Sequence, residues 1–421
     1  MSLDLLSILL LAAAIIIGFL TKVNVGILSI SFALVLGHIM GVTDKAIISG
    51  FGSNLFVTLV GVTFLFSILT ENNTIELLAQ KIVSLIGSKS WLLPIIIFLT
   101  GYGLTAIGPG SIPILAIMPV FAVPVAIARG YHPLMMALIG DFGIFAGRMS
   151  PITPESILVH ELLAKDNIIS AVTGPIIANQ TITGVICALL AFIYYKGYNV
   201  SSTSFQTTHL PRFTKEQRFS LLGLAVMVIA VIGFKCNVGL VSFAVGAILL
   251  CIKAGHEGPS IRGIPWGVLL MICGVGVLMK LVVDAGGIQL MSAALSVLMN
   301  SYTASAVMGI TSGIMSWFSS GLGVVFPTLI PVVGPLANSL GHVSPVELAS
   351  LVVIGGTFTG VSPFSSTGGL IMAAVMTNQN MTGESQHLSS NKVFMELIIW
   401  SVITLVVLTL LALCGVYSLF L

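Results

Sequence analysis

Charged side chains are scarce in this sequence. Asp, Glu, Lys and Arg make up only 7% of its 421 residues, whereas a soluble domain carries about 25%. Hydrophobic residues make up 57%, and residues 5–20, 55–70 and 398–421 form long apolar runs. A helix of about 20 apolar residues crosses a bilayer. The composition therefore predicts an all-α polytopic membrane protein, and the first run, which lacks a basic leader, is expected to be a retained transmembrane helix.

Sequence signatures of enzymes and metal centres are also absent. The five cysteines stand singly without a CxxC or Cys/His spacing, which excludes a zinc site and a disulfide framework. His160 and Glu161 begin an HExxH pattern, but Ala164 stands where the second histidine belongs, and Leu138 replaces the first glycine of a GxGD pattern. There is no P-loop and no GxSxG. We expect no enzyme and no cofactor, and the net charge of +2 does not indicate a nucleic-acid partner.

What the sequence does contain is an internal repeat. The stretch GRMSPITPES at 147–156 has a counterpart in GVSPFSSTGG at 360–369. Pro119 matches Pro331 (331 − 119 = 212) and Pro151 matches Pro363 (363 − 151 = 212). Ile75 matches Ile288 at almost the same offset (288 − 75 = 213). This nearly constant offset predicts two repeats, residues 1–197 and 218–421, joined by a polar linker at 198–217.

Each repeat is expected to cross the membrane five times, with the fourth crossing broken in its middle. The expected crossings are 4–20, 27–42, 55–70, 134–160 and 170–195, then 218–234, 237–252, 265–283, 345–376 and 396–418. Before each broken helix, AIGPGSIP at 106–113 or FSSGLGVVFP at 318–327 interrupts an apolar run, which predicts a re-entrant hairpin. Because five is odd, the second repeat must be inverted relative to the first.

The distribution of basic residues agrees with this topology. With the linker in the cytoplasm, eleven basic residues lie inside: Lys22, Lys81, Lys89, Arg129, Lys196, Arg212, Lys215, Arg218, Lys253, Arg262 and Lys392. Four lie outside: Lys45, Lys165, Lys235 and Lys280. Lys and Arg favour the cytoplasmic side. We therefore expect an integral protein of the inner (plasma) membrane with both termini outside.

Broken helices inside a membrane are expected where a polar solute binds. Irregular backbone is tolerated there only when protein or a water-filled cavity covers it, and paired breaks in inverted repeats are typical of secondary transporters. Helix N-termini favour anions, whereas carbonyl and hydroxyl oxygens suit a small cation.

The ionisable residues near the first break have alternative interpretations. Arg148 either binds a substrate carboxylate or forms a structural ion pair with Glu155. Asp141 is either a cation or proton site or a carboxyl group satisfied by a neighbouring helix. Glu155 and His160 are expected to approach the outer surface in a solvated role, which His342 and Glu347 mirror at the second break.

The motifs GPGSIP in the first hairpin and SPFSSTGGLIMAAV after the second break resemble those of MatC-type dicarboxylate carriers. These carriers belong to the ion transporter superfamily, which also contains the INDY-type divalent anion/sodium symporters. The resemblance implies an elevator-type carrier and a homodimer: the first three helices of each half form the scaffold, and the hairpins, broken helices and last helices move. The implied partners are a small dicarboxylate and the lipid bilayer.

The resemblance also implies where the binding residues lie. The substrate-binding candidates are the hairpin tips and break loops: Pro109, Gly110, Ser111, Arg148, Ser150, Thr153, Ser319, Ser320, Ser362, Ser365, Ser366 and Thr367. The candidate Na⁺ ligands are Gly108, Asp141, Gly321 and Thr359. Neither tip preserves the Ser-Asn-Thr motif of the INDY branch, so Na⁺ symport, H⁺ symport and exchange all stay open. An inorganic anion or Na⁺/H⁺ transporter on this fold, or an ion channel, is the alternative function.

Overall fold

The computed structural model describes residues 2–84, 90–166, 168, 172–200, 210–341, 343–377 and 389–420. Lys89, His342 and the middle of the expected linker lie outside these ranges. Within them the regular elements are helical and no strand occurs, so the all-α prediction is confirmed. Seven continuous helical runs in the described part are long and apolar enough to cross a membrane, and further apolar helices are shorter. The count of ten crossings stays a prediction.

The two halves contain the same order of helices. In the first half these are α1 (Leu3–Thr21), α2 (Val25–Ile39), α3 (Asp44–Ile48), α4 (Ser53–Glu71), α5 (Thr74–Ser84), α6 (Leu93–Ala106), α7 (Ser111–Ala128), α8 (Pro133–Gly147), α9 (Pro154–Lys165) and α10 (Thr173–Tyr194). In the second half they are α11 (Lys215–Phe234), α12 (Val238–Cys251), α13 (Glu257–Arg262), α14 (Trp266–Asp284), α15 (Gly287–Val297), α16 (Ala304–Phe318), α17 (Phe326–Leu340), α18 (Pro345–Phe358), α19 (Ser366–Thr377) and α20 (Ser390–Leu413).

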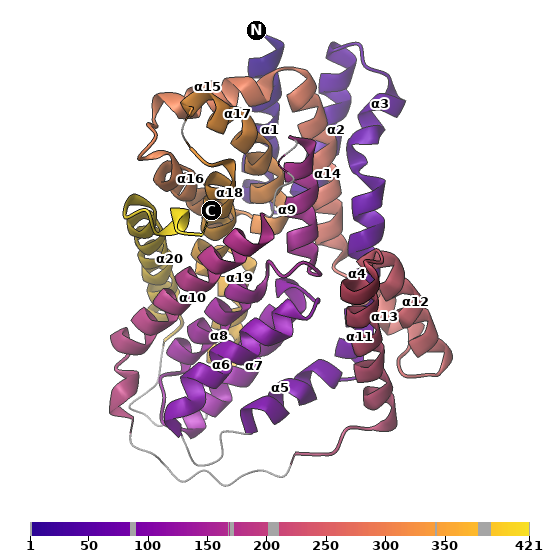
Figure 1. The fold of residues 1–421 in the computed structure, drawn as a ribbon, viewed down its shortest axis with the longest axis vertical. Coiled ribbons are helices and arrows are strands. Elements are labelled where there is room, and N and C mark those ends of the chain that lie inside the picture. The colour runs from indigo at the N-terminus through magenta and orange to yellow at the C-terminus, as the bar shows by residue number, and fades with distance from the viewer. Residues whose placement is uncertain are drawn as a thin grey trace.

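The repeat offset seen in the sequence recurs at the helix starts. The helices α8 and α18 begin at Pro133 and Pro345 (345 − 133 = 212), and α9 and α19 begin at 154 and 366 (366 − 154 = 212). Figure 1 shows the hairpin α6–α7 in the lower part of the molecule and α16–α17 in the upper part. An inverted repeat would place the hairpins in this way, and their orientation relative to a bilayer stays a prediction.

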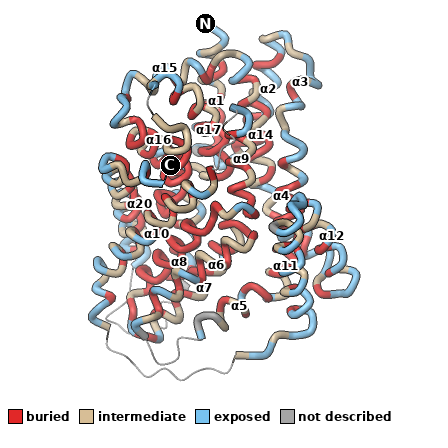
Figure 2. Tube along the Cα trace, in the orientation of Figure 1, coloured by how far each residue is buried: buried red, intermediate tan, exposed pale blue. Residues whose placement is uncertain are grey.

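The helices pack into two groups. In the paired-helix group, α1–α4 and α11–α14, helix α2 lies against α14 and α4 against α12. In the hairpin group, α6–α10 and α16–α20, helix α6 lies against α8 and α16 against α18. Nearly all residues of α8 and α18 are buried, and Figure 2 shows the buried residues along α8. The hairpins and broken helices thus lie in one group, and the assignment of a fixed scaffold and a mobile part stays a prediction.

Glycines allow the helix pairs of the hairpin group to approach closely. A Cβ added at Gly143 would collide with the carbonyl oxygen of Phe98, and one at Gly355 would lie 2.5 Å from the carbonyl oxygen of Gly309. Gly143 (α8) and Gly355 (α18) are related by the repeat offset (355 − 143 = 212). The same tight seam therefore recurs in both halves.

The linker ends earlier than expected. Helix α11 begins at Lys215 rather than at 218, because Thr214 and Gln217 form a capping box in which each side chain binds the other's backbone N–H. Such a box satisfies two N–H groups that would otherwise lack a partner. The expected linker 198–217 therefore contributes its last residues to the first turn of α11.

Candidate functional site

Both broken helices are interrupted where the sequence predicts. Between α8 and α9 the chain leaves helical geometry from Arg148 to Thr153, and between α18 and α19 a short 3₁₀ turn at Thr359–Val361 precedes the break. Pro151 and Pro154 lack the N–H that a continuous helix needs. Thr153 then restarts the chain as the N-cap of α9: its hydroxyl accepts from the N–H of Ser156 at 3.3 Å and donates to the carbonyl of Arg148 at 2.6 Å.

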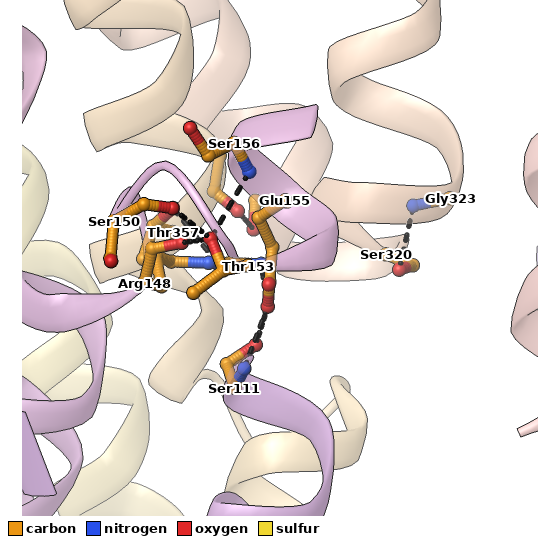
Figure 3. A network of polar contacts seen from close by, with 11 residues as sticks. Ser111, Arg148, Ser150, Thr153, Glu155, Ser156, Ser320, Gly323 and Thr357 are labelled. Carbon is orange, nitrogen blue, oxygen red and sulfur yellow. Dashed lines mark hydrogen bonds and ion pairs between the residues drawn. The ribbon is translucent and has the colours of Figure 1, made fainter. Parts of the chain in front are cut away.

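Glu155, in the first turn of α9, binds the tip of the first hairpin. Its Oε1 accepts hydrogen bonds from the backbone N–H of Ser111 at 2.7 Å and from the Ser111 hydroxyl at 2.5 Å. Ser111 is the first residue of α7, so the carboxylate lies at a helix N-terminus, where N–H groups and the helix dipole favour an anion. Figure 3 shows Glu155 between Ser111 and the loop of the break.

Gly110 makes this contact possible. Its backbone has φ of 73° and ψ of −170°, a conformation that is essentially restricted to glycine. A Cβ at this position would collide with Oε2 of Glu155 and lie 3.0 Å from Cδ of Pro154. The hairpin tip and the start of α9 therefore fit together only with glycine at 110.

Arg148 joins the two halves of the molecule at this point. Its Nη2 lies 3.4 Å from Oε1 of Glu155, and its Nη1 donates to the hydroxyl of Thr357 at 3.0 Å. Its guanidinium carbon lies 5.5 Å from the centre of the Phe326 ring, a cation–π distance. Thr357 belongs to α18 and Phe326 begins α17. The arginine of the first break is therefore held partly by the second repeat (Figure 3).

The expectation that Glu155 is solvated is wrong. Its side chain is only 1% exposed, and that of Arg148 is 7% exposed. The physical reason is the hairpin tip, which covers the N-terminus of α9 and supplies the donors that water would otherwise provide. His160, one turn and a half further, is half-buried and its ring contacts the hydroxyl of Thr173.

The pair of Arg148 and Glu155 still has unused hydrogen-bonding capacity. Among the described residues, neither Nε of Arg148 nor Oε2 of Glu155 has a hydrogen-bond partner. A buried donor without a partner costs free energy of about 1–3 kcal/mol, so the site favours an additional acceptor. The ion pair predicted as one alternative is present, and it does not exhaust the donors of the arginine.

Four candidates of the second half lie beside a cavity. Ser319, Ser320, Ser365 and Ser366 line a space of about 360 Å³. This cavity also touches Lys22 and Asn24 between α1 and α2. The Ser320 hydroxyl accepts from the N–H of Gly323 at 3.0 Å, and the Ser365 hydroxyl contacts the carbonyls of Gly360 and Ser362. These hydroxyls therefore stabilise the local turns and border the cavity at the same time.

The remaining substrate-binding candidates lie in varied surroundings. Ser150 is half-buried and its carbonyl accepts from Thr153. Pro109 lines a small crevice with Phe66, Leu104 and Leu224, on the side of the hairpin that faces α4 and α11. Ser362 is buried, whereas Thr367 is half-buried at the start of α19. Their roles in binding stay predictions.

The four candidate sodium ligands have separate environments. A Cβ at Gly108 would meet the Phe66 ring at 3.0 Å, and one at Gly321 would collide with the carbonyl of Gly356. The Thr359 hydroxyl lies 2.8 Å from the carbonyl oxygens of both Gly313 and Gly355, to which its single hydrogen can be donated. Asp141 is fully buried in α8, and neither of its carboxyl oxygens has a hydrogen-bond partner among the described residues. The sodium sites stay a prediction.

The sequence predicts a pairing of Arg148 with Glu155 but does not indicate Thr357 or Phe326 as parts of the site. The pairing with Glu155 is predictable because a buried arginine requires a counter-charge, and Glu155 is the carboxylate just beyond the break. No comparable signal exists for Thr357 or Phe326, since only the packing of the second repeat against the first brings them to Arg148.

The comparisons with known proteins bear on the family and the fold. Residues 1–148 match a family described as the N-terminus of the dicarboxylate carrier protein MatC, which confirms the resemblance over that part of the chain. No curated protein matches the chain in sequence.

Among solved structures, the chain is similar to the YdaH transporter of Alcanivorax borkumensis, with 12% identity and a TM-score of 0.57. The similarity covers 88% of this chain and 87% of that one. Because the sequence identity is so low, this similarity shows a shared fold and nothing more specific. The chain is therefore an integral membrane protein with the fold of a transporter, and the comparisons favour transport over enzymatic catalysis.

Proposed function

We propose that this chain is a secondary active transporter for a small organic dicarboxylate of three or four carbons, such as malonate, malate or succinate. The observation that supports it most strongly is a carboxylate-binding site at the first hairpin tip. There Ser111, at the N-terminus of α7, and Arg148 together bind a carboxylate group, which in this structure belongs to Glu155. A site that holds one carboxylate in this way has the chemistry to hold another.

The proposed movement is that of an elevator in a homodimer. The hairpin group carries both tips and both breaks, and its helices α9 and α17 pack against α4 and α14 of the paired-helix group. A group that moves as a body exposes its site to one side of the membrane and then to the other. The coupling is by cation symport or by exchange of one dicarboxylate for another.

Counterflow in proteoliposomes tests the proposed function. Vesicles loaded with unlabelled succinate are expected to accumulate external radiolabelled succinate or malate transiently, with and without a Na⁺ gradient. Stimulation by the internal substrate is a property of carriers and is not shown by channels. Absence of uptake across a panel of dicarboxylates would overturn the substrate class, and uptake without stimulation by internal substrate would favour a channel.

A further inference from the structure

The carboxylate of Glu155 occupies the donors that the proposed function assigns to a substrate. Three donors converge on its Oε1: the backbone N–H and hydroxyl of Ser111, and Nη2 of Arg148. Resting on the proposed function, we infer that Glu155 is a built-in substitute for the substrate carboxylate and is the proton-binding residue of the transport cycle. When Glu155 takes up a proton, Ser111 and Arg148 become available to an incoming dicarboxylate.

In the second repeat, the equivalent position is satisfied without a carboxylate, in a tip that forms a short π-helix at Gly321–Val325. The residues equivalent to Ser111 and Glu155 by the offset are Gly323 (111 + 212) and Thr367 (155 + 212). At Gly323 the backbone N–H donates to the hydroxyl of Ser320, three residues before it. At this second tip, the backbone N–H therefore has a hydroxyl from the same turn as its hydrogen-bond acceptor. The first repeat instead uses an ionisable group 44 residues away in the chain.

Charge and burial explain why release requires a proton. Glu155 is almost completely buried, and two carboxylates at one dry site repel each other strongly. Moving the ionised side chain away from its three donors into the protein would leave an unpaired buried charge, which is very costly. Protonation forms an O–H bond on the Glu155 carboxylate, which becomes a neutral acid, and no other covalent bond changes. On release of the substrate, the proton leaves Glu155 and the carboxylate returns to Ser111 and Arg148.

Within the described residues, Glu155 is the ionisable group that hydrogen-bonds to both Ser111 and Arg148. The helices packed against α9 are α4 and α17; α17 carries no ionisable side chain, and α4 carries only Glu71, which binds His256 at its far end. Helix α7 also has none. The remaining groups on neighbouring elements and on α9 itself are Asp141 (two turns before Arg148 in α8), Glu347 (bound to Ser305 at the far end of α18), His160, Glu161 and Lys165.

Proton uptake on ligand binding tests the inference. Purified protein in weakly buffered, Na⁺-free solution is mixed with succinate while a pH indicator dye is followed. The wild type is expected to take up about one proton more per bound succinate than Glu155→Gln. In the pH range where binding is coupled to that proton, the succinate affinity of the wild type should fall about tenfold for each unit by which the pH is raised. Glu155→Gln is expected to bind succinate, and its affinity should not show this additional fall with rising pH. Protons taken up by succinate itself appear equally in both proteins and cancel in the difference.

Glu161→Gln is the matched control, because Glu161 lies on the same helix and, within the described residues, makes no hydrogen bond to Ser111 or Arg148. It should retain the wild-type proton uptake. Equal uptake in Glu155→Gln and the wild type, or loss of succinate binding in a folded Glu155→Gln, would overturn the inference. If no protein binds any dicarboxylate of the panel, the proposed function itself fails.

Infrared difference spectroscopy of the wild type keeps the inference testable if Glu155→Gln does not fold. Addition of isotopically labelled succinate, whose own carboxyl bands are shifted, should produce the C=O band of a newly protonated protein carboxyl group. Absence of this band would contradict the inference. Persistence of the band in a folded Glu155→Gln would assign the proton to another residue and would contradict it as well.

Discussion

Arg148 donates a hydrogen bond to the hydroxyl of Thr357 across a sequence separation of 209 residues. This bond joins the break of the first repeat to the helix that precedes the break of the second. The same guanidinium contacts Glu155 and the Phe326 ring. One side chain therefore links the first hairpin, through Glu155, to the second hairpin, through Phe326, and the site depends on both repeats being folded together.

Arg148→Lys is expected to lower succinate affinity by about tenfold or more while the protein still folds. A lysine keeps the charge, but its ammonium group cannot reproduce the planar fork that contacts Glu155 and Thr357 at once. Binding is measured by calorimetry or by inhibition of counterflow. The exposed Arg262→Lys on α13 is the matched control and should leave the affinity unchanged. Normal binding by Arg148→Gln would show that Arg148 is structural.

Gly110→Ala is expected to destabilise the first hairpin and abolish counterflow. The backbone conformation at Gly110 costs other residues about 1–3 kcal/mol, and the new Cβ would collide with Glu155. Gly103→Ala on α6 is the control, since no atom lies within 4 Å of its added Cβ and alanine favours a helix by up to about 1 kcal/mol. The two variants should shift the melting temperature in opposite directions. A Gly110→Ala protein as stable as the wild type would contradict the geometry of the tip.

Gly143→Ala and Gly355→Ala are expected to destabilise the protein to a similar extent. Each glycine lies in a helix seam where an added Cβ meets a backbone carbonyl of the partner helix, and overpacking a close contact typically costs about 1–3 kcal/mol. Thermal unfolding in detergent measures the effect. Gly369→Ala, with open space around its Cβ, is the control. If only one of the two seams were sensitive, the two repeats would not share this packing.

A disulfide between the two helix groups is expected to stop counterflow. A Cβ at Gly323, in the second hairpin, would lie 3.0 Å from Cγ of Met271 in α14, so cysteines at these positions are close enough to bond. The double variant Met271→Cys/Gly323→Cys is made in a background without the native cysteines. Reduction should restore transport, and each single variant should be insensitive to oxidation. Transport that continues with the disulfide formed would contradict an elevator movement.

Most of the fold was predictable because apolar length and proline position act locally. The expected breaks near Pro151 and Pro363 coincide with the ends of α8 and α18, since a missing N–H interrupts a helix whatever surrounds it. The expected start of α11 was less accurate, because the capping box at Thr214 extends the helix toward the linker. The hydroxyl-rich loops were also placed correctly, although their hydrogen bonds were not predictable.

The sequence by itself determined the class of the protein, the repeat and the residues that interrupt its helices, because composition, period and proline chemistry are properties of the chain. Only the tertiary structure decided which groups meet. Glu155, read as solvated, is buried because a hairpin tip 44 residues earlier covers it. Arg148 is shared between Glu155 and Thr357 because the second repeat packs against the first. Burial and hydrogen bonding between distant segments depend on how helices pack, and one sequence pattern is compatible with several such packings.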